Sequence, residues 1–569
     1  MRRLISPLVV AVVAGCAVVP QPADLVLTGG VVWTGAVGAP TGQAVAIRNG
    51  RIVRVGTDDE VRSFVGPATR EIKLGGRLVV PGFIDDHTHF ISGGFQLGSV
   101  DLRDASSPRE FTARIARFVR QAPTGRWVTG GDWDHERWAG GVLPRHEWID
   151  SVTKETPVFV TRLDGHMGLA NRKAMQLAGI TKATKDPVGG TIVRDARTGE
   201  PTGVLKDGAM DLVTTLIKVS NAEYDDAFRR AQAHALSLGV TMIEDMGGNG
   251  WDDFETFRRA RDSGELKLRV YSFVPLSSWE RLRDYVARNG TGDSRLRWGG
   301  LKGFVDGSLG STTAWFFQPF TDAPKTSGLM VTDTAKMREW ILGADKAHLH
   351  VAVHAIGDRA NDWILNTYEW VAEQNGKRDR RFRIEHAQHL LRNDVGRFAQ
   401  LGVLPSMQPY HAIDDGRWAE KRIGPERIKT TYAFRSLLKG GARLMFGSDW
   451  TVAPLDPLLG IYAAVTRRTL DGRYPTGWQP QEKVTVQDAL RAYTANNAYG
   501  AFMERELGSL EQGKRADLVV LSQNILKMDP TRIPEARVDY TVIGGEIVYV
   551  RPQQAGVGPA SGPLAVDAH

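Results

Sequence analysis

Eight apolar runs that each end in polar residues constrain the fold of this chain more than any other feature. Stretches of helical character, such as residues 227–238 and 337–348, alternate with them. Eight strands alternating with helices predict a (β/α)8 barrel with a parallel sheet at its centre. The runs span residues 79–89, 241–246, 268–274, 301–306, 351–356, 382–388, 403–408 and 444–449.

The two ends of the chain have a different texture. Short β-branched runs separated by glycine-rich turns occur near both ends, and Asn49-Gly50 between two of them is a strong hairpin signal. We therefore expect one small β domain built from residues 23–78 and 504–551, around a barrel of residues 79–503. The last residues, 552–569, are rich in Pro, Gly and Ala and are expected to form a flexible tail.

A long insertion is expected after the first barrel strand. Roughly 150 residues separate the first run from the second, far more than one strand-to-helix connection needs. This stretch contains strand-like runs of its own at 127–129 and 158–160. We expect an inserted subdomain over the barrel mouth, at about residues 95–238.

The N-terminus has the pattern of an export signal. Arg2 and Arg3 precede an apolar run over residues 4–13, which is too short to span a bilayer as an ordinary helix. Residues 13–16 resemble a bacterial lipobox, which predicts a signal peptide over 1–15, a lipid anchor on Cys16 and a linker over 16–22. Ala17 favours the periplasmic side of the outer membrane in a Gram-negative cell. A plain secretory signal or a buried N-terminal strand is the alternative.

Composition narrows the function classes. With 42% apolar residues and one cysteine, the chain is neither disordered nor disulfide-framed. The net charge of +7 comes from 72 basic and 65 acidic residues, without a concentrated basic run. Nucleic acid is therefore not an expected partner. The sequence sets no oligomeric state, and a homo-oligomer is compatible with it.

Metal-ligating residue types stand at the ends of the predicted strands. His87 and His89 are two residues apart, so both rings lie on the same face of a strand and can bind one ion. Working residues of such barrels come from the C-terminal ends of the strands. The candidates for a metal site are His87, His89, Lys302, His354, His386 and Asp449.

At these residues the sequence resembles the amidohydrolase superfamily. Further runs narrow the resemblance to the amidohydrolase-3 branch, which includes N-substituted formamide deformylases, and it extends over about residues 23–550. It implies a metal-dependent hydrolase on a barrel with a composite β-sandwich. The matching runs are VVPGFIDDHTHF, HVAVHAIGDRAND, RIEHAQ, FGSDW, GFVDGSLGS, GGDWD, DGHMGLAN and GKRADLVVL.

The resemblance also implies how the ligands are shared. His87, His89 and Asp449 would hold the more buried ion, and His354 with His386 a second one, so that one or two ions are bound. Zinc suits mixed imidazole and carboxylate ligands, although manganese, iron or nickel can substitute.

Lys302 matches the position at which many members carry a carboxylated lysine. An ammonium has no lone pair for a cation, whereas a carbamate can bridge two ions. Glu244 is the alternative carboxylate, and a lysine that extends to solvent is the alternative reading of Lys302.

Catalytic roles follow from this site. Asp449 is expected to accept a proton from the attacking water and to return it to the departing amine. Asp85 is expected to orient the His87 side of the site, and His411 to hydrogen-bond the substrate carbonyl. His166 is expected to close over the substrate from the insertion.

Two further residues, Trp133 and Ser308, lie in family-like motifs but are not assigned a catalytic role. Trp133 is expected either to close over the substrate or to pack in the core of the insertion. Ser308 is expected to belong to a loop and not to act as a nucleophile.

The expected function is hydrolysis of a non-peptide C–N bond in a small-molecule amide, formamide or cyclic amide. The same site could instead deaminate a heterocycle or open a lactone or ester. A non-catalytic envelope lipoprotein is a third reading, but such a protein should have lost ligands, and every ligand position is filled here.

Overall fold

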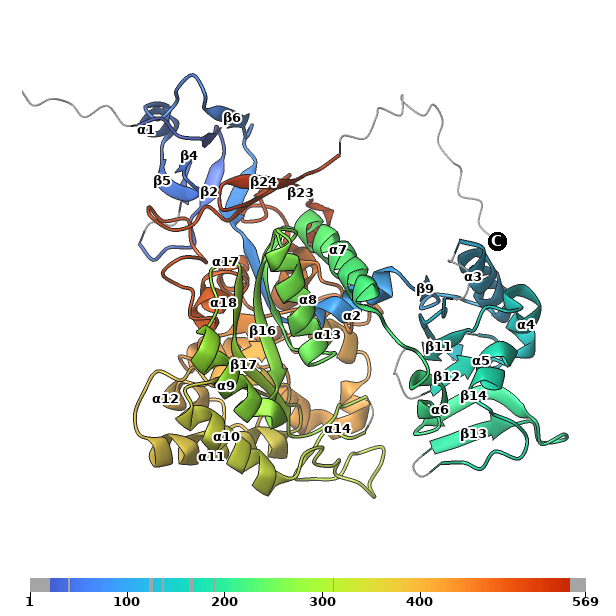
Figure 1. Cartoon of the computed structure of the whole chain (residues 1–569). Helices are drawn as coiled ribbons and strands as arrows, with labels where there is room; N and C mark the ends of the chain where they lie inside the picture. Colours follow the sequence, from blue (N-terminus) through green and yellow to red (C-terminus); the bar gives the residue numbers. More distant parts are fainter. Residues whose placement is uncertain are drawn as a thin grey trace, which may run out of the picture.

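A computed structural model describes residues 21–38, 41–121, 126–135, 138–162, 167–187, 190–310 and 312–552. Three parts are visible in Figure 1: a β-sandwich at the top, a barrel below it, and an inserted unit to the right. The predicted signal peptide, Cys16 and the tail from residue 553 lie outside the described residues. Within the described part of the chain, no helix is long and apolar enough to cross a membrane.

The barrel confirms the predicted fold class. Its eight strands form one parallel sheet in chain order, and a bridge between Thr88 and Trp450 brings the last strand back beside the first. The strands are almost entirely buried because helices cover them on the outside. They are β8 (Phe83–Thr88), β15 (Val240–Asp245), β16 (Arg269–Pro275), β17 (Leu296–Phe304), β18 (His350–Ala355), β19 (Arg383–His386), β20 (Leu404–Met407) and β21 (Met445–Phe446).

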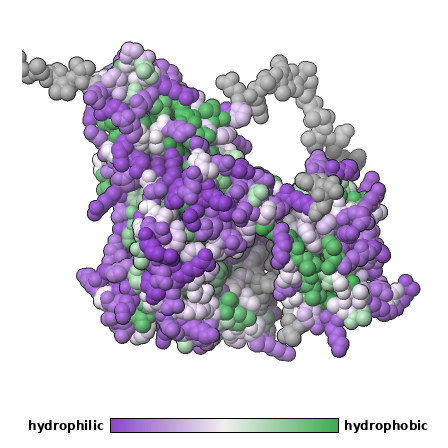
Figure 2. All heavy atoms as spheres, viewed as in Figure 1, coloured by the Kyte–Doolittle hydropathy of each residue, from purple (hydrophilic) through white to green (hydrophobic). Residues whose placement is uncertain are grey.

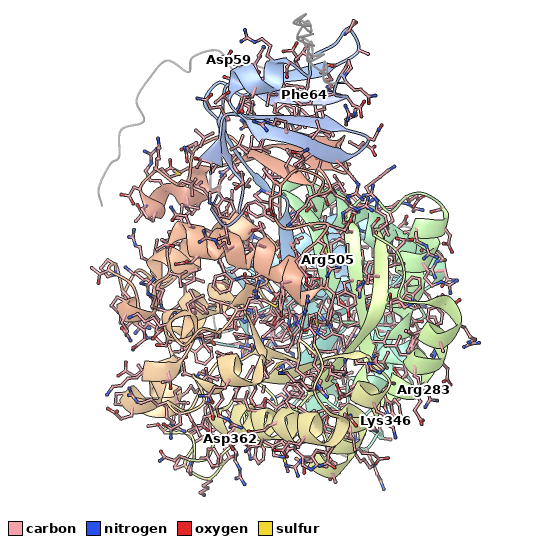
Figure 3. All side chains as sticks on the ribbon, turned by 90° about the vertical axis from the view of Figure 1, so that its left-hand side faces the viewer. Asp59, Phe64, Arg283, Lys346, Asp362 and Arg505 are labelled. Atoms are coloured by element: carbon pink, nitrogen blue, oxygen red, sulfur yellow. The ribbon has the colours of Figure 1, made fainter. Side chains whose placement is uncertain are left out.

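Helices follow the strands and cover the outside of the barrel. One of them, α7 (Asn221–Ser237), begins with a capping box between Ser220 and Glu223 and buries one apolar stripe that includes Phe228. In Figure 3, Arg283, Lys346 and Asp362 mark outer helices at the end of the barrel away from the sandwich. The other helices are α2 (Phe90–Leu97), α8 (Trp251–Asp262), α9 (Trp279–Asn289), α10 (Thr334–Lys346), α11 (Asp358–Asn375), α12 (Arg397–Leu401), α13 (Pro409–Asp415), α14 (Ala419–Arg427), α15 (Phe434–Lys439), α16 (Pro457–Thr466), α17 (Val486–Ala492) and α18 (Ala495–Gly500).

Both ends of the chain contribute to the β-sandwich. One sheet is built in the order β5-β4-β1-β6 and the other in the order β24-β23-β22-β7-β2-β3. Leu27, Val45 and Val520 are among the apolar residues between them. The strands are β1 (Leu25–Thr28), β2 (Val31–Trp33), β3 (Thr41–Gly42), β4 (Ala44–Arg48), β5 (Arg51–Gly56), β6 (Arg70–Lys73), β7 (Leu78–Pro81), β22 (Leu518–Leu521), β23 (Val538–Ile543) and β24 (Glu546–Val550), and α1 (Asp58–Arg62) packs beside the first sheet.

The insertion is a separate unit with its own six-stranded sheet and apolar core. Hydrophobic residues gather on the face of this unit that Figure 2 shows, while hydrophilic residues cover most of the barrel. Its elements are β9 (Val100–Asp101), α3 (Pro108–Gln121), β10 (Gly130–Trp133), α4 (Glu147–Thr153), β11 (Phe159–Arg162), β12 (Met167–Ala170), α5 (Arg172–Leu177), β13 (Gly190–Arg194), β14 (Pro201–Asp207) and α6 (Asp211–Thr214).

Two expected boundaries differ from the structure. The run 79–89 was expected to be one barrel strand, but β7 pairs with β2 and β22 of the sandwich, and only β8 enters the barrel. The apolar run is continuous because both strands are buried, so hydropathy alone does not show where one sheet ends. The insertion was expected to reach residue 238, but α7 packs on α2 and α8 and belongs to the barrel.

Candidate metal centre

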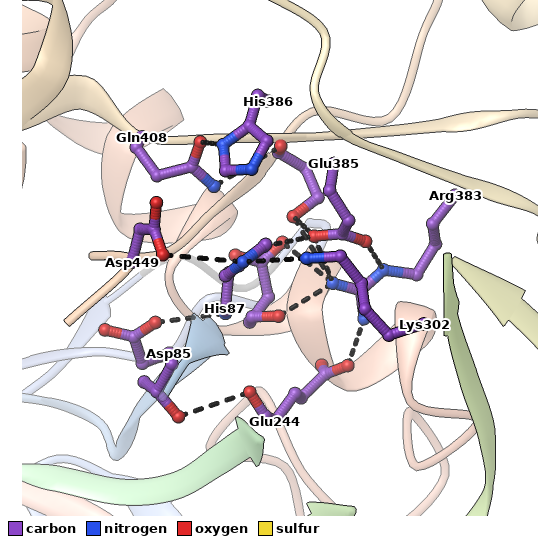
Figure 4. Close-up of polar contacts among 12 residues, drawn as sticks. Asp85, His87, Glu244, Lys302, Arg383, Glu385, His386, Gln408 and Asp449 are labelled. Atoms are coloured by element: carbon purple, nitrogen blue, oxygen red, sulfur yellow. Dashed lines mark hydrogen bonds and ion pairs between the residues drawn. The ribbon is translucent and has the colours of Figure 1, made fainter. Parts of the chain in front are cut away.

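Side chains from the ends of several barrel strands meet at one point (Figure 4). His89 Nε2 lies 3.3 Å from Asp449 Oδ1, and His87 Nε2 lies 3.6 Å from the same oxygen. Lys302 Nζ lies 3.3 Å from His87 Nε2. Residues that are far apart in the sequence are therefore adjacent, because all of them stand at the C-terminal ends of parallel strands.

The ligand atoms of His87, His89 and Asp449 lie within 4.8 Å of one another. Asp449 is 6% exposed, yet its Oδ1 accepts no hydrogen bond from the described residues. A buried carboxylate oxygen without a donor is costly unless a cation binds it. The donor set, two imidazoles and one carboxylate, therefore fits a divalent metal ion such as zinc.

His386 and His411 form a second group with Asp449, and their ligand atoms also lie within 4.8 Å of one another. The resemblance paired His386 with His354, and those two rings are in contact, with centroids 4.5 Å apart. His354 Nε2, however, lies 3.0 Å from the carbonyl oxygen of Gly307. An Nε2–H donated to that carbonyl leaves Nδ1 of His354 as its free acceptor.

The backbone is strained where the ligands leave their strands. His386 has φ of 73°, and Asp449 has φ of 56°, in the left-handed region that non-glycine residues rarely adopt. Two contacts hold Asp449 in place: its N–H donates to His87 O at 2.7 Å, and Asp85 accepts from Ser448 N at 3.0 Å. Asp85 also accepts from His87 N, so this carboxylate joins both ligand-bearing strands, in agreement with its predicted orienting position.

His87 contacts a buried network of ion pairs inside the barrel. His87 Nδ1 lies 2.5 Å from Glu385 Oε2, and Arg383 holds the other oxygen of this carboxylate at 2.8 Å. Arg383 also pairs with Oε2 of Glu244, the alternative carboxylate of the sequence analysis, so this oxygen points to the guanidinium. Arg383 and Glu385 were not among the residues that the sequence patterns pointed to. The available signal was two charged residues at a spacing of two within an otherwise apolar strand, which places both inside the barrel.

Burial sets the protonation states of the cluster. It lowers the pKa of His87 to about 4 and that of His354 to about 3, so both imidazoles are neutral and able to bind a metal. Burial also lowers the pKa of Lys302 to about 8. Burial alone would raise the pKa of Asp449. The neighbouring His87, His89 and His386 lower it by more than burial raises it, so the pKa of Asp449 lies well below its usual value.

A cavity of about 570 Å³ is lined by several residues of this cluster, among them His89, Lys302 and Asp449. Arg162, which is the last residue of β11 in the inserted unit, also lines this cavity. Its lining includes His89, Arg162, Lys302, Phe304, Ser308, His354, His386, Gln388, His411, Asp414, Asp415, Trp418, Asp449 and Val452.

The remaining predicted residues lie in different places. His166 lies outside the described residues. Trp133 is fully buried in the core of the insertion, where its Nε1–H donates to Val160 O at 2.9 Å. Of the two positions expected for Trp133, the structure shows the one in the core. His411 lies on α13, with Nε2 3.9 Å from Asp449 Oδ2. Ser308 lies in the loop after β17, as expected, and lines the cavity.

A parallel eight-stranded barrel with this cluster at its strand ends defines an amidohydrolase-type barrel. The model of the "Amidohydrolase family" matches residues 70–549, and the chain belongs to this family. This confirms the resemblance seen in the sequence.

Individual relatives agree with this assignment. The chain is 44% identical to Protein LONG AFTER FAR-RED 3 of Arabidopsis thaliana over 539 residues, covering 93% of this chain and 92% of that protein. It is 30% identical to an N-substituted formamide deformylase of Arthrobacter pascens over 526 residues, covering 90% and 95%. An uncharacterized metal-dependent hydrolase from Pyrococcus furiosus superposes with a TM-score of 0.74 at 31% identity, covering 88% of this chain and all of that one. Family and relatives together support a hydrolase.

Proposed function

We propose that the protein is a metal-dependent hydrolase that cleaves a non-peptide amide, formamide or cyclic amide C–N bond. The observation that carries this proposal is the unpartnered Oδ1 of Asp449 between the Nε2 atoms of His87 and His89. The likeness to an N-substituted formamide deformylase over nearly the whole chain supports the choice of bond.

His87, His89 and Asp449 would hold one divalent ion, most suitably zinc. His386 would hold a second, with His354 or His411 as its partner. When bound, such an ion supplies Lewis acidity toward a carbonyl oxygen and makes water more acidic.

We propose that Lys302 is carboxylated. Its Nζ is buried beside His87, and with a pKa of about 8 part of the population is a neutral amine at neutral pH. The amine nitrogen attacks the carbon of CO2 and loses one proton, which leaves an N-carboxylate. This change replaces a cation by an anion among the ligands and removes the repulsion between an ammonium and a metal ion.

The chain's own residues move the protons. The Oδ2 oxygen of Asp449, which the ion held at Oδ1 leaves available, accepts a proton from the attacking water, and the same carboxylate donates it to the departing nitrogen. His411 Nε2 is buried without a hydrogen-bond partner among the described residues and lines the cavity, so it is placed to meet the substrate carbonyl. His166 would approach from the insertion.

One experiment tests the proposal. Metal analysis of purified protein is combined with a panel of N-formyl amines, N-acyl amino acids, cyclic amides, lactones and amino-heterocycles. The double variant His87→Ala/His89→Ala should lose bound metal and hydrolysis together, whereas His348→Asn, a change at an exposed histidine, should lose neither. Full metal retention in the double variant would remove the basis of the site. Exclusive turnover of lactones or heterocycles would replace the proposed bond.

We further propose that the protein is exported and anchored by a lipid on Cys16 on the periplasmic side of an outer membrane. The basic start, short apolar run and lipobox-like residues support this location.

A further inference from the structure

Asp415 is a carboxylate in the wall of the cavity that the hydrolytic site leaves unused. It is the last residue of α13, four residues after His411. Residues four apart on a helix lie on one face, with Cβ atoms about 5–6 Å apart. The wall that brings His411 to Asp449 therefore also presents Asp415, one helical turn further along.

This carboxylate is fixed by neutral donors. Its Oδ2 accepts from Tyr432 OH at 2.6 Å and from Gln388 Nε2 at 2.8 Å. Gln388 is held in turn, because its Nε2 also lies 3.1 Å from His389 Nε2, while His389 Nδ1 lies 2.8 Å from Thr431 Oγ1. Burial lowers the pKa of His389 to about 3, so this ring is neutral as well.

No basic side chain of the described residues lies within 4 Å of the Asp415 carboxylate. Its neighbour Asp414 differs, because it pairs with Arg417. Burial raises the pKa of Asp415 to about 6, which leaves it ionised above neutral pH. Asp415 is partly buried, and an anion that is shielded from water without a cation beside it is unfavourable, since such charges in proteins are usually paired.

We propose that Asp415 determines specificity by pairing with an ammonium group of the substrate, about one helical turn from the scissile bond. The substrate class is then an amide or formamide whose nitrogen substituent carries a primary ammonium at the end of a short alkyl chain. This inference rests on the proposed amide hydrolysis and adds the identity of the substituent. Trp418, which lines the same cavity, would pack against the alkyl spacer.

The test compares two substrates of equal length, N-formyl-1,4-diaminobutane and N-pentylformamide, which differ in an ammonium against a methyl group. We expect the full-length wild-type protein to favour the cationic formamide by about 10- to 100-fold in kcat/KM, the range for a hydrogen bond to a charged group. Asp415→Asn should remove this preference and leave kcat/KM for N-pentylformamide within about threefold. Asp414→Asn is the matched control and should keep the preference.

Calorimetric titration of both formamides into wild type and Asp415→Asn gives a readout that does not need turnover. Tighter binding of the cationic formamide in wild type alone supports the inference even if neither compound is hydrolysed, and in that case only the proposed function fails. Equal binding and equal turnover of the two formamides by wild type would overturn the inference. A preference that survives Asp415→Asn would overturn it as well.

Discussion

His87 Nδ1 and Glu385 Oε2 lie 2.5 Å apart inside the barrel. The contact fixes one tautomer of His87, because Nδ1–H donates to the carboxylate and Nε2 keeps its lone pair on the side of Asp449. Burial alone would raise the pKa of Glu385. Arg383 and His87 lower this pKa by more than burial raises it, so the carboxylate stays ionised. Partners of this kind orient metal-binding imidazoles.

The first prediction concerns this carboxylate. Glu385→Gln keeps the size of the side chain but removes the charge that selects the His87 tautomer. We expect metal affinity to fall by about 10- to 100-fold, the usual effect of such a change, while all ligands remain. Competition with a chelator measures this. Ser406→Ala removes one neutral donor to Glu385 and one acceptor of Arg383 but no charge, so it should have a smaller effect. Wild-type affinity in Glu385→Gln would mean that the carboxylate does not orient the ring.

The second prediction concerns Lys302. If Lys302 is carboxylated, Lys302→Ala should lose activity, and a short carboxylic acid that fills the vacated space should restore part of it. Mass spectrometry of the intact wild-type protein, prepared with bicarbonate, should show the added mass of one CO2, and the variant should not. Lys336→Ala is the control, because Lys336 lines a neighbouring cavity but is exposed. An unmodified, solvent-directed Lys302 after bicarbonate treatment would refute the carbamate.

The third prediction uses His389, which is buried away from the ligand cluster. Its folded pKa of about 3 lies below the unfolded value near 6.5, so between these values the unfolded chain binds the extra proton and stability falls as pH falls. His389→Gln lowers the free energy of unfolding, and this difference between wild type and variant should shrink by about 1.4 kcal/mol per pH unit as the pH falls from roughly 6 to 4.

Denaturant unfolding of wild type and variant at each pH measures this difference. The other buried groups titrate in both proteins, so their contribution cancels in the difference. A constant cost for His389→Gln would show that His389 is protonated in the folded protein too.

The fourth prediction concerns location. Cys16→Ser should prevent lipid attachment, so that the precursor stalls or the protein leaves the membrane fraction. Metabolic labelling with a fatty acid and membrane fractionation measure both effects. If the variant fractionates and migrates as wild type does, a plain secretory signal is the better explanation.

The sequence predicted the barrel well because its strands are continuous apolar runs that each end in polar residues. His87, His89 and Asp449 lie close together in the structure, and the spacing of the two histidines and the chain order of the strands made this proximity predictable. The sequence did not predict that His411 approaches Asp449, because the path of α13 after β20 depends on packing.

The buried ion pairs of Glu385 and Arg383 could not be predicted from the ends of the strands. Glu385 and Arg383 face the interior of the barrel, where a charged residue is tolerated only through contacts with other strands. Those partners, Glu244 on β15 and His87 on β8, are 139 and 298 residues away in the chain. Local patterns do not contain that information, whereas the closed sheet brings the residues together.

The last prediction concerns proton transfer by Asp449. Its backbone is held by His87 O, and its Oδ1 lies between two imidazole nitrogens, so Asp449→Asn should keep an oxygen in nearly the same position. An amide oxygen can still touch a metal ion, but it cannot accept and return a proton at neutral pH. Metal content should therefore fall only modestly, while kcat should fall by about 10²- to 10⁴-fold, the usual contribution of a positioned acid–base group. Metal analysis and steady-state kinetics on the same preparation separate the two roles, with Asp414→Asn as a control from the same cavity. If kcat of Asp449→Asn stays near that of wild type, the proton is moved by another group, and His411, whose Nε2 lies 3.9 Å from Asp449 Oδ2, is the residue to replace next.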